Sequence, residues 1–207
     1  MKKLLALILA LCCISALFCF SVSAAGEKEV LLVVENDSGS IKVDISTEFA
    51  CGAVQGAIKY DGDQIAYQSS TVAAGINSIN EPANSISNTS GTTKVGFVCA
   101  SNGGFSGQLA SIEYSADESV PAIFDFTALK AFDKDGAKLT DVKVSVALLG
   151  DADNDGFVTV KDLVYFKQIL LGEKTVAAGK ERNLDVNRNG TNAQDNDITQ
   201  LRMNLLK

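Results

Sequence analysis

The residues best suited to chemistry lie in one short stretch that begins at Asp151. Asp151, Asp153 and Asp155 alternate with other residues, Gly156 follows directly, and Asp162 comes six residues after the glycine. Carboxylates at positions one, three, five and twelve of a loop, with a glycine at position six for the sharp turn, place oxygen atoms around a single point. A hard cation such as calcium takes about six to eight oxygens at about 2.3–2.6 Å. The stretch therefore predicts a calcium loop.

A solvated turn is the alternative interpretation of this stretch. Turns also concentrate Asp, Asn and Gly, but they require neither the regular alternation nor the closing carboxylate of Asp162. We expect calcium as the cofactor, with Phe157 at position seven contributing its backbone carbonyl.

The elements around the loop differ from those of an EF-hand. Residues 141–148 alternate between polar and apolar side chains, which predicts a strand rather than an entering helix. After the loop, apolar residues recur at helical spacing from Leu163 to Leu170, and Gly172 is a natural helix stop. The expected unit is a strand, a calcium loop and one helix.

A second loop of the same kind begins thirty-four residues after the first. Asp185, Asn187, Asn189 and Gly190 occupy positions one, three, five and six, and Asp197 precedes a second helical pattern. Only two of these ligands are carboxylates, so calcium binding here should be weaker or absent.

The closing residue of the second loop has two possible registers. If Asp197 closes the loop, the loop is one residue longer than the first. If Asn196 closes it, the donor set is weaker still.

The two loop–helix units, over residues 150–207, resemble a dockerin, the calcium-dependent plug module of cellulosomes. Aspartate at position twelve and the missing entering helix are part of this resemblance. The resemblance implies that a cohesin of a scaffoldin is the partner, contacted by positions ten and eleven of each loop and seventeen and eighteen in each helix. These residues are Val160, Lys161, Lys167 and Gln168 in the first repeat. In the second repeat, with positions counted so that Asp197 closes the loop at position twelve, they are Asp195, Asn196, Arg202 and Met203.

The two sets of contact residues differ in charge. Val160 and Lys161 are apolar and cationic, whereas Asp195 and Asn196 are anionic and polar. One cohesin surface cannot suit both sets, because a charge reversal across an interface disfavours the wrong pose. We therefore expect a single binding pose with the first repeat as the main contact.

Residues 1–25 have the pattern of a secretory signal peptide. Lys2 and Lys3 precede an apolar run over 4–20, and small residues follow at 22–24. An uncleaved anchor is the alternative, because the run is nearly long enough to span a bilayer. We expect a secreted, extracellular protein that joins a cell-surface complex through its partner and has no membrane segment after cleavage.

The net charge of the chain after residue 25 limits the classes of partner that it can bind. Without Lys2 and Lys3, 16 basic residues stand against 25 acidic residues, a net charge of about −9. This charge argues against nucleic acid and anionic membrane surfaces as partners. Cys51 and Cys99 are the cysteines outside the signal; we favour two buried thiols over a disulfide, because Cys99 shares a strand face with apolar residues.

Residues 26–149 carry repeated strand signals separated by Gly, Asn and Asp, which predicts an all-β sandwich. We expect an irregular loop over 76–91. The turn signals at 133–136 predict a hairpin turn, although this stretch imitates the start of a calcium loop. The signals at 60–63 predict a turn. The predicted strands cover residues 29–35, 41–46, 54–60, 64–72, 93–100, 108–116, 122–127, 130–133 and 139–148.

The sandwich also resembles a cohesin, through the segments 52–61, 94–100, 109–114, 123–126 and 131–133. This resemblance implies a jelly roll that binds dockerins. Carbohydrate-binding modules share the same fold, so the fold does not decide the function. The expected fold class is multidomain: an all-β jelly-roll sandwich followed by a small α calcium-loop–helix repeat.

Three functions follow from these features. The first is a non-catalytic adaptor scaffoldin, with a socket for a dockerin-bearing enzyme and a plug for a cohesin. The second is a carbohydrate-binding accessory subunit. Sugar rings stack on Trp or Tyr, and because the chain has no Trp, the stacking residues would be Tyr60, Tyr67 or Tyr114. The third is a small glycoside hydrolase, which needs two carboxylates. The absence of His excludes Ser-His-Asp and Cys-His catalysis and His-ligated zinc.

Overall fold

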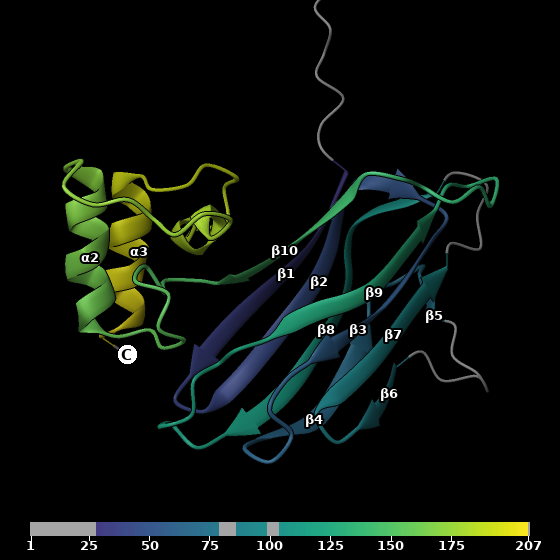
Figure 1. Cartoon of the computed structure of the whole chain (residues 1–207), viewed down its shortest axis with the longest axis horizontal. Coiled ribbons are helices and arrows are strands. Elements are labelled where there is room, and N and C mark those ends of the chain that lie inside the picture. Colours follow the sequence, from purple (N-terminus) through teal and green to yellow (C-terminus); the bar gives the residue numbers. More distant parts are fainter. Residues whose placement is uncertain (1–27, 79–85, 99–103, 207) are drawn as a thin grey trace, which may run out of the picture.

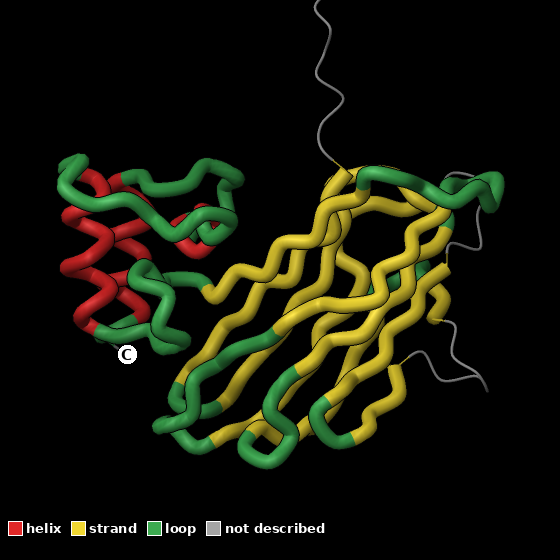
Figure 2. Tube along the Cα trace, viewed as in Figure 1, coloured by secondary structure: helices red, strands yellow, loops and turns green. Residues whose placement is uncertain are grey.

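The computed structural model describes residues 28–78, 86–98 and 104–206, which form a β-sandwich followed by a small helical module (Figure 1). Figure 2 shows the separation plainly, with strands confined to the first part and helices to the second. The strands are β1 (Lys28–Asp37), β2 (Ser40–Cys51), β3 (Ala53–Lys59), β4 (Ile65–Val72), β5 (Asn77–Ser78), β6 (Ile86–Thr89), β7 (Thr92–Val98), β8 (Phe105–Ala116), β9 (Asp125–Phe132) and β10 (Val142–Leu148). The helices are α2 (Val160–Leu170), the 3-10 helix η1 (Glu181–Leu184) and α3 (Asp195–Asn204).

The sandwich consists of two sheets. One has the strand order β10-β1-β2-β8-β4, and the other has the order β5-β7-β3-β9, with β6 also paired to β7. The pairing of β1 with β10 is parallel, and the other pairings are antiparallel. The predicted fold class, a sandwich followed by loop–helix units, is confirmed.

The core of the sandwich follows from the period-two alternation of its strands. Val43 and Ile45 of β2 face inward with Ile112 of β8, and Ile58 and Phe97 face them from the opposite sheet. Each apolar side chain removed from water contributes roughly 1.5–3 kcal/mol, so these paired layers supply the driving force for the fold.

Two sequence predictions about strands were wrong. Residues 125–127 and 130–132 of the predicted strands 122–127 and 130–133 belong to a single strand, β9, and residues 122–124 precede it. Ala128 of β9 adopts a positive φ of 55° where the pairing with β3 shifts register. The loop predicted over 76–91 contains the short strands β5 and β6, which pair with β7. These strands are short, polar and mostly exposed, so their sequences lack the apolar alternation that predicts a strand.

The helical module has its own small core. Phe166 of α2 and Leu201 of α3 are buried together with Ala152, Leu184 and Val186. Thr159 caps α2, and Gly172 follows the helix with a φ of 72°. The 3-10 helix η1 was not predicted from the sequence, because its four residues carry no periodic signal.

The remaining sequence predictions concern the turns, the two cysteines and membrane-spanning segments. Both predicted turns are present: Ile65 N donates to Asp61 O (2.8 Å) in the turn that joins β3 to β4 of the other sheet, and Asp133 N donates to Ala137 O (2.9 Å). Cys51 is buried and its thiol lies 3.7 Å from Phe105 O, whereas Cys99 and the signal sequence lie outside the described residues. None of the helices in the described ranges combines the length and apolar character needed to cross a bilayer.

Gly56 generates a test of the sandwich packing. A Cβ at this position of β3 would overlap the buried ring of Phe126, so we expect Gly56→Ala to destabilise the sandwich by about 1–3 kcal/mol. Denaturant unfolding should show the loss, while Gln55→Ala on the exposed side of the same strand should stay within about 0.5 kcal/mol of the original chain. Equal stability of the two variants would mean that the Phe126 ring can move aside.

Candidate metal centre

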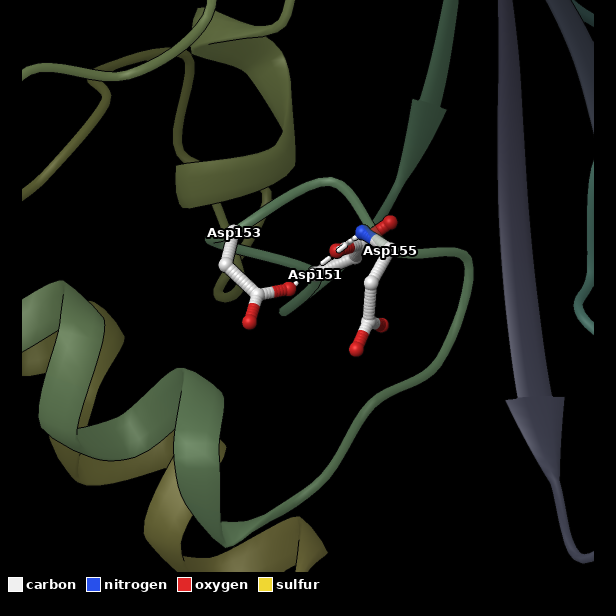
Figure 3. A group of neighbouring side chains, drawn as sticks. All are labelled: Asp151, Asp153 and Asp155. Atoms are coloured by element: carbon white, nitrogen blue, oxygen red, sulfur yellow. Dashed lines mark hydrogen bonds between the residues drawn. The ribbon is translucent and has the colours of Figure 1, made fainter.

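The three alternating aspartates of the first loop converge (Figure 3). The carboxylate oxygens that Asp151, Asp153 and Asp155 offer lie within 4.8 Å of one another. Asp151 is buried, Asp153 is half-buried and Asp155 is exposed, so the cluster opens from the protein interior toward solvent. The structure thus brings together three of the ligands that the spacing predicted.

The backbone of the loop turns around Asp151. Its carboxylate accepts hydrogen bonds from the N–H groups of Asp155 and Gly156, each 3.1 Å long. The turn requires positive φ values at Asn154 (61°) and Gly156 (87°). A Cβ on Gly156 would also lie 2.8 Å from Cβ of Pro121 in the sandwich, so both the turn and its surroundings require glycine.

Asp162 closes the loop from the other end. It is buried, and its Oδ1 accepts from Ala152 N (2.9 Å) while its Oδ2 accepts from Thr159 N (2.8 Å). Asp162 therefore joins the first turn of α2 to the start of the loop, but its carboxylate is not part of the 4.8 Å cluster. Phe157 is half-buried, and its N–H donates to Asp155 Oδ1 (2.9 Å).

The electrostatics of this loop fit a bound cation. Burial raises the pKa of Asp151 to about 6, opposed by the hydrogen bond from Gly156 and reinforced by the charge of Asp162. Burial also raises the pKa of Asp162, in spite of its hydrogen bond from Thr159. Both shifts mean that the local environment disfavours the carboxylate charge unless a positive group is added. An all-oxygen donor set of this kind suits calcium or another hard cation.

The second loop repeats the hydrogen bonds of the first. Asp185 accepts from the N–H groups of Asn189 and Gly190, each 2.9 Å long. Asp197 accepts from Asn187 N (3.1 Å), in the way that Asp162 accepts at the first loop. This correspondence supports the register that closes on Asp197.

The extra residue of the second loop is accommodated near Ala193, which has a positive φ of 58°. Arg188 occupies the position of Asn154 and has nearly the same φ, 58°. Asn187 and Asn189 replace carboxylates with neutral amides, and the buried Oδ1 of Asn192 has no hydrogen-bond partner. The second loop keeps the shape of the first with fewer negative charges.

Sequence reasoning missed the residue that joins the two loops. Asn183 of η1 is buried; its Nδ2 donates to Asp151 O (2.8 Å) and its Oδ1 accepts from Leu148 N (3.1 Å). The backbone carbonyl of Asn183 also accepts a hydrogen bond from Gly150 N (2.8 Å). One side chain thus connects the end of β10, the first loop and the segment before the second loop. No spacing rule marks such an asparagine, because its role depends on contacts distant in sequence.

The predicted partner-contact residues lie on the two helices and at their starts. Val160, Lys161 and Lys167 are exposed and Gln168 is half-buried. The structure places these four on α2 and the second set on α3, and the two helices pack side by side (Figure 1). The second set, all exposed, is Asp195, Asn196, Arg202 and Met203.

One protein-family model matches the helical module. Residues 149–206 match the model of the dockerin type I domain. A search of curated proteins finds no match to the chain.

Among solved structures, similar chains include several cohesins. The sixth cohesin of scaffoldin B from Acetivibrio cellulolyticus, in complex with a Cel5 dockerin, shares 16% identity and a TM-score of 0.46 over 58% of this chain and 98% of its own. A non-cellulosomal cohesin from Archaeoglobus fulgidus shares 12% identity and a TM-score of 0.44 over 58% and 88%. The cohesin CaCohA2 from Clostridium acetobutylicum shares 16% identity and a TM-score of 0.43 over 61% and 95%.

The difference between the loops predicts two unequal calcium affinities. We expect calorimetric titration of the full chain to resolve one tight site and one weaker site, because the first loop has four carboxylates and the second has two. Asp155→Asn should weaken the tight site at least about tenfold by removing one ligand charge. The matched control is Asp135→Asn in the hairpin turn that imitates a calcium loop, which should leave both sites unchanged. Two equal affinities would contradict the argument from ligand charge.

Chelation should unfold the helical module. Its core contains only five buried apolar residues, so a bound cation must supply much of its stability. We expect a chelator to remove the helical circular dichroism signal and to leave the strand signal of the sandwich. A helical signal that persists without calcium would show that the small core is sufficient.

Proposed function

We propose that this chain is a secreted, non-catalytic component of a cellulosome-like, polysaccharide-degrading complex. In this proposal the helical module binds a cohesin when calcium is present, and the sandwich binds the dockerin of another protein. The observation that carries the proposal is the dockerin type I match over 149–206, which coincides with two loop–helix units and a cluster of three aspartates. Calcium supplies the positive charge that lets the buried carboxylates of the loops remain ionised.

The cohesin-binding surface of this proposal is the exposed face of α2. Val160, Val164 and Leu171 are 66%, 56% and 69% exposed, an unusual fraction for large apolar side chains on one short helix and its end. Lys161 and Lys167 stand beside them. Such a surface fits a partner with an apolar centre and an acidic rim.

The face of α3 has a different character. Asp195, Asn196 and Thr199 are polar and exposed, and Met203 is the large apolar residue exposed among them. The two helices therefore do not offer equivalent surfaces, which supports a single binding pose through α2.

The dockerin-binding surface of the sandwich is proposed on the sheet β5-β7-β3-β9. The helical module already contacts the opposite sheet through β1 and β2. The outer side of β3, β7 and β9 has a shallow groove of about 620 Å³, lined by Gln55, Lys94 and Lys130 among small residues. A groove that combines small and apolar residues with two cations suits a helical partner that carries acidic side chains.

The tyrosines argue against a sugar-stacking surface. Tyr114 is buried, with its ring centroid 5.0 Å from that of Tyr60 and 6.0 Å from that of Tyr67. Tyr60 and Tyr67 are half-buried and pack against Tyr114 and the core, whereas a stacking platform needs exposed ring faces. We therefore rank carbohydrate binding second. The glycoside hydrolase alternative ranks third, because Glu48 pairs with Arg182 and Glu113 accepts from Ser69 instead of standing free.

Binding panels test the proposal. We expect the full chain to capture a cohesin and a dockerin from panels of purified modules in calcium, and to lose the cohesin in chelator. Strong retention on an insoluble glucan without any captured dockerin would favour the carbohydrate-binding alternative.

The difference between the surfaces of α2 and α3 predicts which repeat contributes most to cohesin binding. Lys161→Asp combined with Lys167→Asp should weaken cohesin affinity by about tenfold or more, because two charges of the proposed interface are reversed. Asp195→Ala combined with Arg202→Ala should change the affinity less than about threefold. Equal small losses from both pairs, measured by calorimetry, would mean that either repeat can serve and that two poses exist.

A further inference from the structure

Residues 171–184 form the linker between α2 and the second loop, and one arginine of this linker holds it against the sandwich. Arg182 of η1 places its Nη2 2.9 Å from Glu29 Oε2 and 2.9 Å from Glu48 Oε1. Its guanidinium thus bridges strand β1 and strand β2. A bridging arginine fixes direction as well as distance, because its donors form a rigid plane.

A second arginine does the same from within the loop. Arg188 lies between the two amide ligands Asn187 and Asn189, and it points to the sandwich rather than to the loop centre. Its Nη2 lies 2.6 Å from Glu35 Oε1, and its Nη1 lies 3.0 Å from Asp44 Oδ2. The positive charge next to the second cation site is therefore paired with carboxylates of β1 and β2.

The carboxylates that receive these arginines are built into the sheet. Glu29 and Asp44 are 5% and 6% exposed, and a buried carboxylate is costly unless it is paired. Glu29 also accepts from Ser145, and Asp44 also accepts from Ser111. Burial alone would raise the pKa of Asp44, but the hydrogen bonds from Ser111 and Arg188 outweigh it and hold the pKa below its ordinary value. The sandwich thus holds fixed negative charges for the two arginines.

The surface between the arginines faces the first ligand of the loop. Leu31 and Val33 of β1 line a cavity of about 240 Å³ together with Asp185 and Gly190. Asp185 lies three residues after Arg182 and three residues before Arg188. Six residues also separate Glu29 from Glu35 along β1. The part of the loop that carries Asp185 and Asn187 is therefore held on both sides by ion pairs to the sandwich.

We propose that the outer face of β1 and β2 is a docking surface for the second loop, and that docking pre-orders this loop and raises its affinity for calcium. The loop has only two carboxylate ligands, so it gains most from being held in its bound shape, which reduces the conformational entropy lost when an ion binds. Because linkage is reciprocal, calcium strengthens the attachment of the module to the sandwich by the same factor. This inference rests on the calcium binding proposed above and does not depend on cohesin binding.

The decisive variant is Arg182→Gln in the full chain. Arg182 precedes the ligands and lies outside the loop, so its removal deletes a positive charge without touching a donor. Through-space electrostatics alone predicts tighter calcium binding after this deletion. Docking predicts the opposite sign: we expect the second site to weaken by about threefold to tenfold, the size of a lost charge-assisted contact, with the first site unchanged.

Two further variants control for charge and folding. Arg182→Lys keeps the positive charge, but its shorter side chain does not carry a nitrogen to the position of Arg182 Nη2 between Glu29 and Glu48, so it should weaken the second site in the same direction. It also preserves a partner for buried Glu29 if the glutamine variant folds poorly. Lys174→Gln removes a cation from the linker, where it lies 4.1 Å from the Tyr165 ring centroid, and should not weaken the second site.

Calcium calorimetry on the full-length variants decides between the outcomes. Weakening of the second site by both Arg182 variants and not by Lys174→Gln supports docking. A second site that is unchanged or tighter in Arg182→Gln overturns it, as does an original chain that binds only one calcium. Cohesin affinity measured in saturating calcium should be unaffected by Arg182→Gln, so failure of the cohesin proposal is separately visible.

Discussion

The parallel pairing of β10 with β1 is the constraint on which the rest of this molecule depends. Seven residue pairs, from Lys28 with Val142 to Val34 with Leu148, fix the last strand at the edge of the sheet. Leu149 N continues this contact by donating to Val34 O (3.1 Å). Asp151 follows two residues later, so the first cation loop starts from a rigid edge and not from a flexible linker.

Further contacts extend this fixed start to the whole helical module. Ala122 N donates to Gly156 O (2.8 Å), which ties the turn of the first loop to the sandwich. Asn183 connects the first loop to the linker, and the linker and second loop reach β1 and β2 through Arg182 and Arg188. These contacts share a direction: both loops face the sandwich, and both helices stand on the far side of the module (Figure 1).

This arrangement separates two tasks of the same module. The loops combine the predicted cation ligands with contacts to the sandwich, while the helices present exposed residues such as Val160 and Val164 to solvent. A partner bound to α2 would therefore be held at a defined angle to the sandwich, because few rotatable bonds lie between them. Rigid coupling of this kind lowers the entropy cost of assembling several modules.

The local patterns were predictable from the sequence because their causes are local. The alternation of Asp151, Asp153 and Asp155 before Gly156 sets a loop whose ligands are neighbours in the chain. Most strands were predictable for the same reason, because alternate residues of a strand point to opposite faces and the apolar ones mark the buried face. Strands β5 and β6 were not predicted. The strand Ile86–Thr89, for example, has one half-buried and three exposed residues and so lacks this alternation.

The sequence by itself determined the fold class, the two loop–helix units and the three carboxylates that converge in the first loop. The tertiary structure decided which charges meet. Arg182 lies 153 residues from Glu29 and Arg188 lies 144 residues from Asp44, and no periodicity links residues so far apart. The burial of Asn183 and the exposure of α2 were decided in the same way. Their physical reason is that hydrogen bonding and ion pairing depend on distances of a few ångströms in space, which only the packed chain defines.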